Sequence, residues 1–263
     1  MMYRLLTLAI LPLLPLNLNG CTEDATASAP PAVKDVYNVV IDGGAIGDGV
    51  TDDTQAIQKT IDMALDASTS VYVPRGTYRI TAPIIIAPKT YSAEKAIRIE
   101  GEWATIRADK EDMNAVVEIF EASFFTMKRL ILDANDKAHH GLEAFKLSGA
   151  SALIEQVTAM GAVSHGFLLQ ACQAATFRNA YAYANGGDGF KMQGCNGSNF
   201  NAITSMSNAG HGISMEGYLY NDEKYSGGCF LSGFDTEKNN GNGVHIGIGN
   251  ISALEDGETQ PTG

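Results

Sequence analysis

The sequence is poor in basic residues. Lys and Arg together number 18 among 263 residues, against 30 Asp and Glu, so the formal net charge is −12. A surface that reads nucleic acid phosphates needs an excess of positive charge, and this balance therefore argues against a nucleic acid partner. It does not exclude an acidic polysaccharide, because a local basic patch can lie within an acidic surface.

Cysteine is also scarce, and no CxxC or His/Cys spacing typical of zinc sites occurs. Once Cys21 is assigned to the leader described below, Cys172, Cys195 and Cys229 remain. An odd number of cysteines in an exported chain argues against a full disulfide framework, so we expect packed thiols or at most one bridge. We predict no metal and no other cofactor; a calcium ion is compatible with the sequence, but no motif supports it.

Long apolar runs are absent after the first 20 residues. In that segment Arg4 precedes an apolar stretch that Pro12 and Pro15 interrupt, which is typical of a secretory signal peptide rather than a transmembrane helix. The run 18–21 (LNGC) resembles a bacterial lipobox, in which Cys21 is lipidated; an ordinary signal peptide is the alternative.

This reading predicts three segments. They are a signal peptide (1–20), a flexible tether rich in Ala, Pro, Ser and Thr (21–35), and a folded domain (36–263). We expect an exported lipoprotein, anchored through Cys21 in the outer membrane, in the periplasm or at the cell surface.

Glycine, with 28 residues, is abundant and marks an internal repeat. Gly141, Gly166, Gly189, Gly212 and Gly243 each follow a polar residue and precede an alternating apolar run, at steps of 25, 23, 23 and 31 residues. A period near 23 with short alternating runs and no helical pattern fits one turn of a parallel β-solenoid. The sequence therefore predicts an all-β parallel β-helix.

Residues one period apart should stack on successive coils, about 4.8 Å apart. We expect inward columns such as Phe167, Phe190 and Ile213, and a ladder of Asn185, Asn208 and Asn239 that satisfies backbone groups at a turn.

The segment before the repeat predicts a cap for the solenoid. We expect a strand at 37–41, a glycine-rich loop at 42–49, and a helix near 53–66 whose N-cap and acidic first turn come from Thr51, Asp52 and Asp53. The loop lacks the GxGxxG spacing, and its aspartates would repel a pyrophosphate, so a dinucleotide site is excluded.

The runs VVIDGGAIGDGVTDDTQAIQKTIDMA (39–64) and VYVPRGTYRI (71–80) resemble the N-terminal signature of the pectate-lyase-like superfamily, in its rhamnogalacturonase and mannuronan C5-epimerase branch. The resemblance implies a right-handed, single-stranded parallel β-helix with an N-terminal capping α-helix, acting on an acidic polysaccharide. Phage spikes and adhesins share this fold, so activity does not follow from it.

Neither catalytic pattern of that superfamily is complete. The run 210–212 matches the Gly-His-Gly element of polygalacturonases, but 187–189 keeps one of two aspartates, His165 replaces another, and no Arg-x-Lys follows. The Tyr-Gly-Phe-Asp-Pro-His-Glu run of mannuronan epimerases corresponds to 165–171, which keeps only Gly and Phe.

Polar residues recur at two places in the repeat. His140, His165, Asp188, His211 and Asn242 precede the repeat glycines, where they either transfer protons or bond turn backbone. On the strands, alternation places Lys191, Glu216 and His245 on the outer surface, as a polysaccharide groove or as an ordinary solvated face.

From these positions we predict a site. Its catalytic residues are Lys191, His211, Asp188 and His165, and its substrate-binding residues are Glu216, Tyr218, Tyr220 and His245. The two tyrosines lie in an extra segment of about seven residues after Glu216, a sugar-stacking loop or simply a tolerated one.

A hydrolase needs two nearby carboxylates, but strand spacing places Asp188 and Glu216 roughly 16 Å apart. We therefore expect a lyase or C5-epimerase on a uronic-acid polysaccharide; a glycoside hydrolase and a non-catalytic polysaccharide-binding β-helix are the alternatives. The polar tail 252–263 supplies no apolar cap, so the tail itself, a partner or further coils should cover the last turn.

Overall fold

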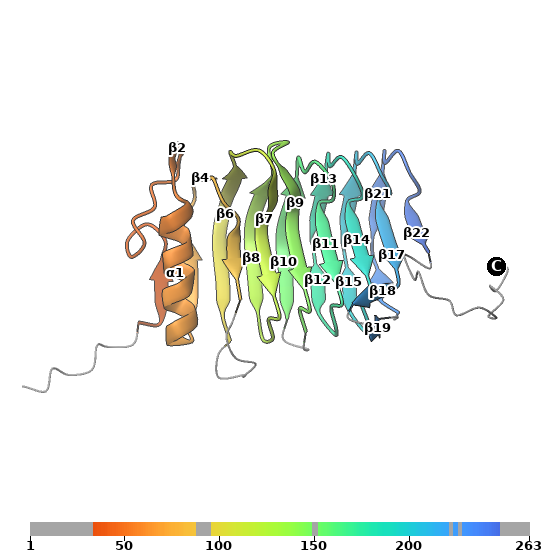
Figure 1. The fold of residues 1–263 in the computed structure, drawn as a ribbon, viewed down its shortest axis with the longest axis horizontal. Coiled ribbons are helices and arrows are strands. Elements are labelled where there is room, and N and C mark those ends of the chain that lie inside the picture. Colours follow the sequence, from red (N-terminus) through yellow and green to blue (C-terminus); the bar gives the residue numbers. More distant parts are fainter. Residues whose placement is uncertain (1–33, 88–95, 149–151, 221–222, 226–227, 248–263) are drawn as a thin grey trace, which may run out of the picture. The chain divides into compact units, whose positions relative to one another are not determined.

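The structure is a computed structural model that describes residues 34–87, 96–148, 152–220, 223–225 and 228–247 (Figure 1). The predicted signal peptide, Cys21 and the tail 252–263 lie outside these ranges. Within them, no helix has the length and apolar character needed to span a membrane.

Two parallel sheets form the walls of a solenoid of about seven turns. The 13-stranded sheet, here sheet A, contains β1 (Val36–Asn38), β2 (Asp48–Asp52), β3 (Ser70–Val73), β4 (Thr77–Ile80), β6 (Arg98–Ala108), β8 (Thr126–Asp133), β10 (Leu153–Met160), β12 (Thr176–Arg178), β13 (Tyr181–Tyr183), β15 (Asn199–Asn201), β16 (Thr204–Met206), β20 (Phe230–Ser232) and β21 (Asp235–Glu237). The seven-stranded sheet, here sheet B, contains β5 (Ile84–Ile86), β7 (Met113–Phe120), β9 (Ala138–Phe145), β11 (Phe167–Gln170), β14 (Phe190–Gln193), β17 (Ile213–Glu216) and β22 (Val244–Ile246). The predicted parallel β-helix is confirmed.

The repeat glycines hold the coils in register, as the sequence predicts. Phe167 pairs with Phe190, which pairs with Ile213, and the two phenyl rings stack at 4.6 Å. On sheet A the rings of Phe177 and Phe200 stack in the same way at 4.8 Å. These buried columns fill the space between the two sheets.

The asparagine ladder is also confirmed. Asn185 Nδ2 donates to Asn208 Oδ1 at 2.8 Å, and Asn208 Nδ2 donates to Asn239 Oδ1 at the same distance. Each amide oxygen accepts a main-chain N–H as well; Asn185 Oδ1 bonds Ala162 N at 3.0 Å. The ladder therefore satisfies the backbone of one turn along successive coils.

The three described cysteines are free thiols, as expected. Cys172 and Cys195 are buried, and each thiol donates to a carbonyl of a neighbouring strand region, at 3.6 and 3.5 Å. Cys229 Sγ donates to the carbonyl of Cys195 at 3.6 Å.

The first strand is shorter than predicted. It ends at Asn38, and residues 39–43 form a turn rather than a strand. The Asn38 side chain causes this change, because Oδ1 accepts the N–H groups of Val40 and Ile41 at 2.8 and 3.2 Å. A side chain that bonds the next two amides competes with strand pairing.

Helix α1 (Thr54–Ala67) confirms the predicted helix but not its capping. Asp53 occupies the N-cap position without a side-chain bond to the helix, and no acidic residue lies in the first turn. Its carboxylate instead accepts the loop amides of Ile46 and Gly47, at 2.7 and 3.0 Å. Asp52 Oδ1 accepts the N–H of Thr54 at 3.0 Å. The loop therefore takes the carboxylate that the sequence assigns to the helix.

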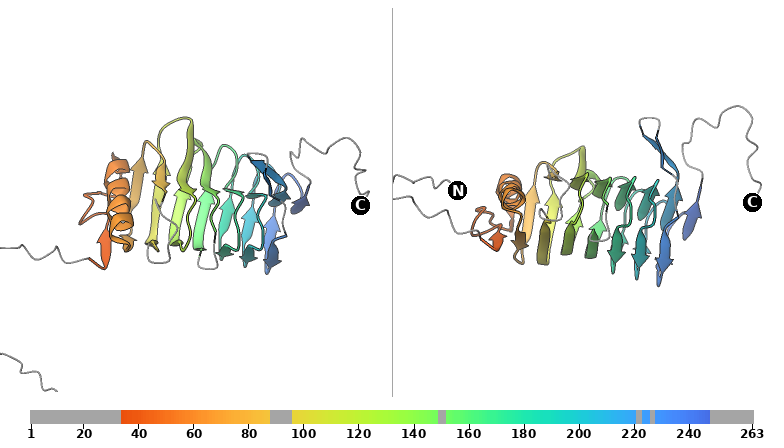
Figure 2. Two further views of the ribbon diagram at one scale, coloured as in Figure 1. Left: turned by 60° about the horizontal axis from the view of Figure 1, so that its bottom comes forward. Right: turned by 90° about the horizontal axis from the view of Figure 1, so that it is seen from below.

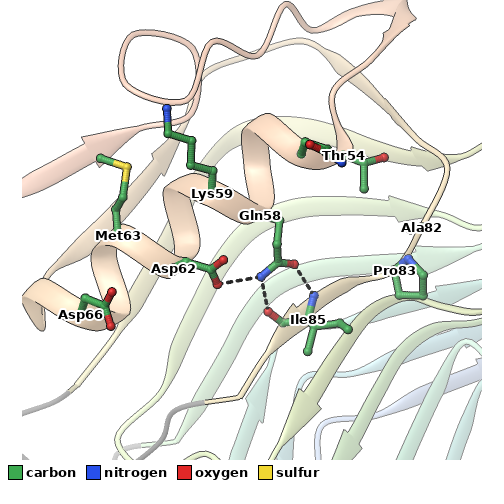
Figure 3. Close-up of a pocket in the computed structure, with 10 residues that line it drawn as sticks. Thr54, Gln58, Lys59, Asp62, Met63, Asp66, Ala82, Pro83 and Ile85 are labelled. Atoms are coloured by element: carbon green, nitrogen blue, oxygen red, sulfur yellow. Dashed lines mark hydrogen bonds between the residues drawn. The ribbon is translucent and has the colours of Figure 1, made fainter.

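Helix α1 covers the end of the stack next to β5, the first strand of sheet B (Figure 1). Gln58 reaches from the helix to Ile85, where its Oε1 accepts the main-chain N–H at 2.8 Å and its Nε2 donates to the carbonyl at 2.9 Å (Figure 3). The side-chain amide thus pairs with β5 as a neighbouring strand would, and it satisfies that part of the sheet edge.

Candidate functional site

The outer face of sheet B carries two columns of outward side chains. The first column, from β7 to β22, is Glu118, Glu143, Leu168, Lys191, Ser214 and His245. The second column is Phe120, Phe145, Gln170, Gln193 and Glu216. The placement of Lys191, Glu216 and His245 on one face therefore agrees with the sequence pattern.

Lys191 is at the centre of the charged part of this face. Its Nζ bonds Glu216 Oε1, lies 3.3 Å from Ser214 Oγ, and lies 3.7 Å from Asp188 Oδ2. The side chains are only 13%, 18% and 9% exposed for Lys191, Glu216 and Asp188. The structure therefore brings three of the predicted site residues together around one partly buried ammonium group.

The predicted separation of Asp188 and Glu216 is wrong. Both carboxylates approach the same Lys191 Nζ, so they lie much closer than the roughly 16 Å that an extended strand implies. The chain bends at Gly189, before β14 begins, so Asp188 is not part of the extended strand. The long lysine side chain spans the remaining distance.

The residues before the repeat glycines form a hydrogen-bonded column along the edge of sheet B. His140 Nδ1, His165 Nδ1 and His211 Nδ1 accept main-chain N–H groups of the next coil, at 3.4, 3.0 and 2.8 Å. Asp188 Oδ1 accepts the N–H of His211 at 2.7 Å. Because Nδ1 is the acceptor, each neutral imidazole carries its proton on Nε2. The column thus bonds turn backbone, and its imidazoles can still donate through Nε2.

Burial sets the protonation of this column. It lowers the pKa of His140 to about 4, with the adjacent His165 adding to the effect. Burial also lowers the pKa of His165, and although Asp188 opposes that shift, Lys191 adds to it. Both rings are therefore neutral at neutral pH, and they stack in parallel at 5.5 Å.

The pKa of Glu216 lies below its usual range. Burial alone would raise it, but the hydrogen bond and the charge of Lys191 outweigh that effect. Glu216 is therefore an anion that anchors Lys191, which fits charge positioning better than proton donation.

His211 and His245 lie at the far end of the face. Their rings stack at 4.5 Å, and His245 is in register with Ser214, one coil beyond Lys191. The structure thus separates these two histidines from His165, which lies beside Asp188 at 3.9 Å between Nδ1 and Oδ2.

Sequence reasoning missed a carboxylate pair on the same face. Glu118 and Glu143 are in register on β7 and β9, and Asn114 Nδ2 donates to both, to Glu118 Oε1 at 3.1 Å. Burial raises the pKa of Glu143; the bond from Asn114 opposes the shift, and Glu118 adds to it. The signal was available, since the two glutamates are 25 residues apart, the same step as Gly141 to Gly166.

The extra segment after Glu216 forms an antiparallel hairpin of β18 (Tyr218–Tyr220) and β19 (Glu223–Tyr225). The hairpin stands away from the coils (Figure 2). The structure does not describe the side chains of Tyr218 and Tyr220, so their substrate-binding role stays a prediction.

A hollow of about 720 Å³ lies between α1 and the segment around β5 (Figure 3). Its polar centre is the Gln58 amide, which already bonds Ile85 and, at 3.0 Å, Asp62. This hollow is part of the cap. Among the described residues, no three His, Cys, Asp or Glu side chains gather so as to hold a metal ion.

Comparison with known proteins agrees with this architecture. A family model described as rhamnogalacturonase A/epimerase, pectate lyase-like, matches residues 36–227. The A-module of a mannuronan C-5 epimerase, AlgE6 of Azotobacter vinelandii, superposes with a TM-score of 0.65 at 26% identity, over 79% of this chain and 58% of that module.

Two curated relatives match shorter stretches. Mannuronan C5-epimerase AlgE5 of Azotobacter vinelandii is 36% identical over 38% of this chain, and the match spans 11% of that protein. A glucan 1,3-beta-glucosidase of Cochliobolus carbonum is 44% identical over 19% of this chain, or 8% of its own length. The chain thus corresponds to a small part of each.

Proposed function

Because the chain belongs to the rhamnogalacturonase A/epimerase family of pectate lyase-like proteins, we propose that it acts on a uronic-acid polysaccharide and removes the C5 proton of one uronate. Loss of that proton is the shared first step of C5 epimerisation and of β-elimination. The observation that carries the proposal is the contact of Lys191 Nζ with Glu216 and Asp188 on the outer face of sheet B.

The chemistry requires a cation and a base. Proton loss at C5 places negative charge on the uronate carboxyl group, and a preorganised ammonium stabilises that charge in a partly buried site. Lys191 is the cation in this proposal, and Glu216 with Ser214 fixes the position of its Nζ. Asp188, within 3.7 Å of the same Nζ, is the base.

His165 is suited to donation rather than to proton abstraction. Its Nδ1 is occupied by the N–H of Asp188, so Nε2–H faces outward as the available group. A hydrogen bond from Nε2–H to the substrate carboxylate would orient the uronate over Lys191. His211 and His245 would bind the chain further along the stack.

The test is an assay on polygalacturonate, alginate and rhamnogalacturonan in deuterated buffer. C5 configuration and deuterium incorporation by NMR report epimerisation, and ultraviolet absorbance reports an unsaturated product. We expect Lys191→Ala to lower kcat/KM by roughly a hundredfold, equivalent to about 3 kcal/mol. Lys128→Ala, which removes a lysine that pairs with Glu155 on sheet A, is the control. Full activity in Lys191→Ala would overturn the proposal.

A glycoside hydrolase is the second candidate, favoured by the proximity of Asp188 and Glu216 on one ammonium. A hydrolase needs one carboxyl group to remain protonated as the general acid. Lys191 instead holds the pKa of Glu216 down, so the geometry favours C5 chemistry. New reducing ends without an unsaturated product would reverse this preference.

A further inference from the structure

We propose that the part of the outer face formed by β7 and β9 selects a sugar without an ionised carboxyl group, next to the uronate at Lys191. The specificity determinants are Glu143 and Glu118, here called the acidic pair. This inference rests on the proposed function, since it assigns specificity to a neighbouring position of the same face.

The dimensions of sheet B set the direction of a bound polysaccharide. Strands β11, β14 and β17 have four residues each, or roughly 13 Å, whereas seven strands at about 4.8 Å span roughly 30 Å. A chain of several sugars therefore fits along the stack and not across it. From Lys191 it passes Leu168 and reaches Glu143, two coils and about 10 Å away.

The acidic pair opposes a further carboxylate at that position. Glu118 is only 9% exposed and lies directly beside the more exposed Glu143, and the donor they share is the neutral amide of Asn114. An ionised uronate there would be a third negative charge within a few ångströms, in surroundings that solvent screens poorly. The adjoining Leu168 adds no charge to offset it.

The same residues suit a neutral sugar. Carboxylate oxygens accept hydrogen bonds from sugar hydroxyl groups, and an ionised acceptor strengthens those bonds. Phe120 and Phe145, in register in the adjacent column and half-buried, offer apolar surface to the C–H face of a ring. Lys146 lies 5.3 Å from the centre of the Phe145 ring, but Glu121 at 3.5 Å offsets its charge.

Binding of two oligosaccharides of equal length tests the inference by calorimetry. One contains only uronates, and in the other neutral sugars alternate with uronates. We expect wild type to bind the alternating one roughly tenfold more tightly at low salt, and less selectively at about 0.15 M salt. Glu143→Gln keeps an acceptor for Asn114 and removes the charge, so it should recover most of this factor for the all-uronate ligand.

Glu100→Gln is the matched control, because it removes one carboxylate from sheet A, where Glu100 pairs with Arg129. It should leave the preference unchanged, and melting temperatures establish that each variant folds. Equal wild-type affinities, no binding of either ligand, or an unchanged preference in Glu143→Gln would overturn the inference. Product formation is scored separately, so a binding preference without any product contradicts only the proposed function, and product without a preference contradicts only the inference.

Discussion

Each imidazole in the column at the edge of sheet B has two tasks. Its Nδ1 accepts a backbone amide of the next coil, and its Nε2–H remains available to a ligand. A single ring thus joins two coils and presents a donor of fixed tautomer. The same residue serves as turn backbone acceptor and as candidate binding group.

Burial of His140 predicts a loss of stability in mild acid. Its folded pKa of about 4 is below its unfolded value near 6.5, so the unfolded chain binds more protons between those two values. The contribution of His140 is complete above pH 6.5 and is lost as pH falls toward 4. We expect this loss to be about 2–3 kcal/mol, with His165 acting in the same direction.

Chemical unfolding at a series of pH values checks this prediction in wild type and His140→Asn. The variant keeps a side-chain acceptor and removes the titrating group, so its stability should fall less between pH 7 and 4.5. His139→Asn, at a neighbouring side chain that is 46% exposed, is the control. Identical pH slopes in wild type and His140→Asn would contradict the assignment.

At the residue scale, sequence reasoning located the column but not the direction of its side chains. Alternation predicts direction inside a strand, and a glycine after the polar residue interrupts that rule. The contact between Asp188 and Lys191 was missed for the same reason, because it depends on the bend at Gly189. Glu118 and Glu143 were missed because the repeat was read from residue 140 onward, after the first of them.

Among the elements, α1 acts on sheet B through one side chain. Gln58→Ala removes two hydrogen bonds to the Ile85 main chain and leaves both groups without that partner, so we expect a loss of about 1–3 kcal/mol in unfolding free energy. Gln58→Glu can still accept the Ile85 N–H but cannot donate to the carbonyl, so it should be intermediate. Urea unfolding measures all three proteins.

Gln55→Ala supplies the matched control, since Gln55 is exposed on the same helix. It should change stability by no more than about 0.5 kcal/mol. Equal stabilities for Gln58→Ala and Gln55→Ala would show that the Ile85 bonds contribute nothing net.

The elements themselves were largely predictable because the signals that define them are local and periodic. The helix at 54–67 follows from its apolar spacing, and the coil strands follow from the repeat. The strand at 37–41 was overestimated because the side chain of Asn38 bonds Val40 and Ile41 in the folded chain. The capping role of Gln58 was not predictable, since it depends on a contact between residues 27 positions apart.

Across the whole molecule, the leader remains a prediction with a direct test. We propose that Cys21 carries a lipid anchor, so Cys21→Ser should move the protein from the membrane fraction to the soluble fraction of a Gram-negative host. Mass spectrometry of the N-terminus identifies the modification. Cys229→Ser should leave fractionation unchanged, and a membrane-bound Cys21→Ser protein would refute the anchor.

The cap on β5 also governs how copies of the molecule can associate. A stack of equivalent coils resembles a one-dimensional crystal, which grows wherever a face offers unpaired strand groups. Gln58 occupies such groups at Ile85 and poisons that growth face of sheet B. Head-to-tail joining through this sheet therefore lacks one of its two surfaces, and a single amide protects a repetitive protein from open-ended fibre formation.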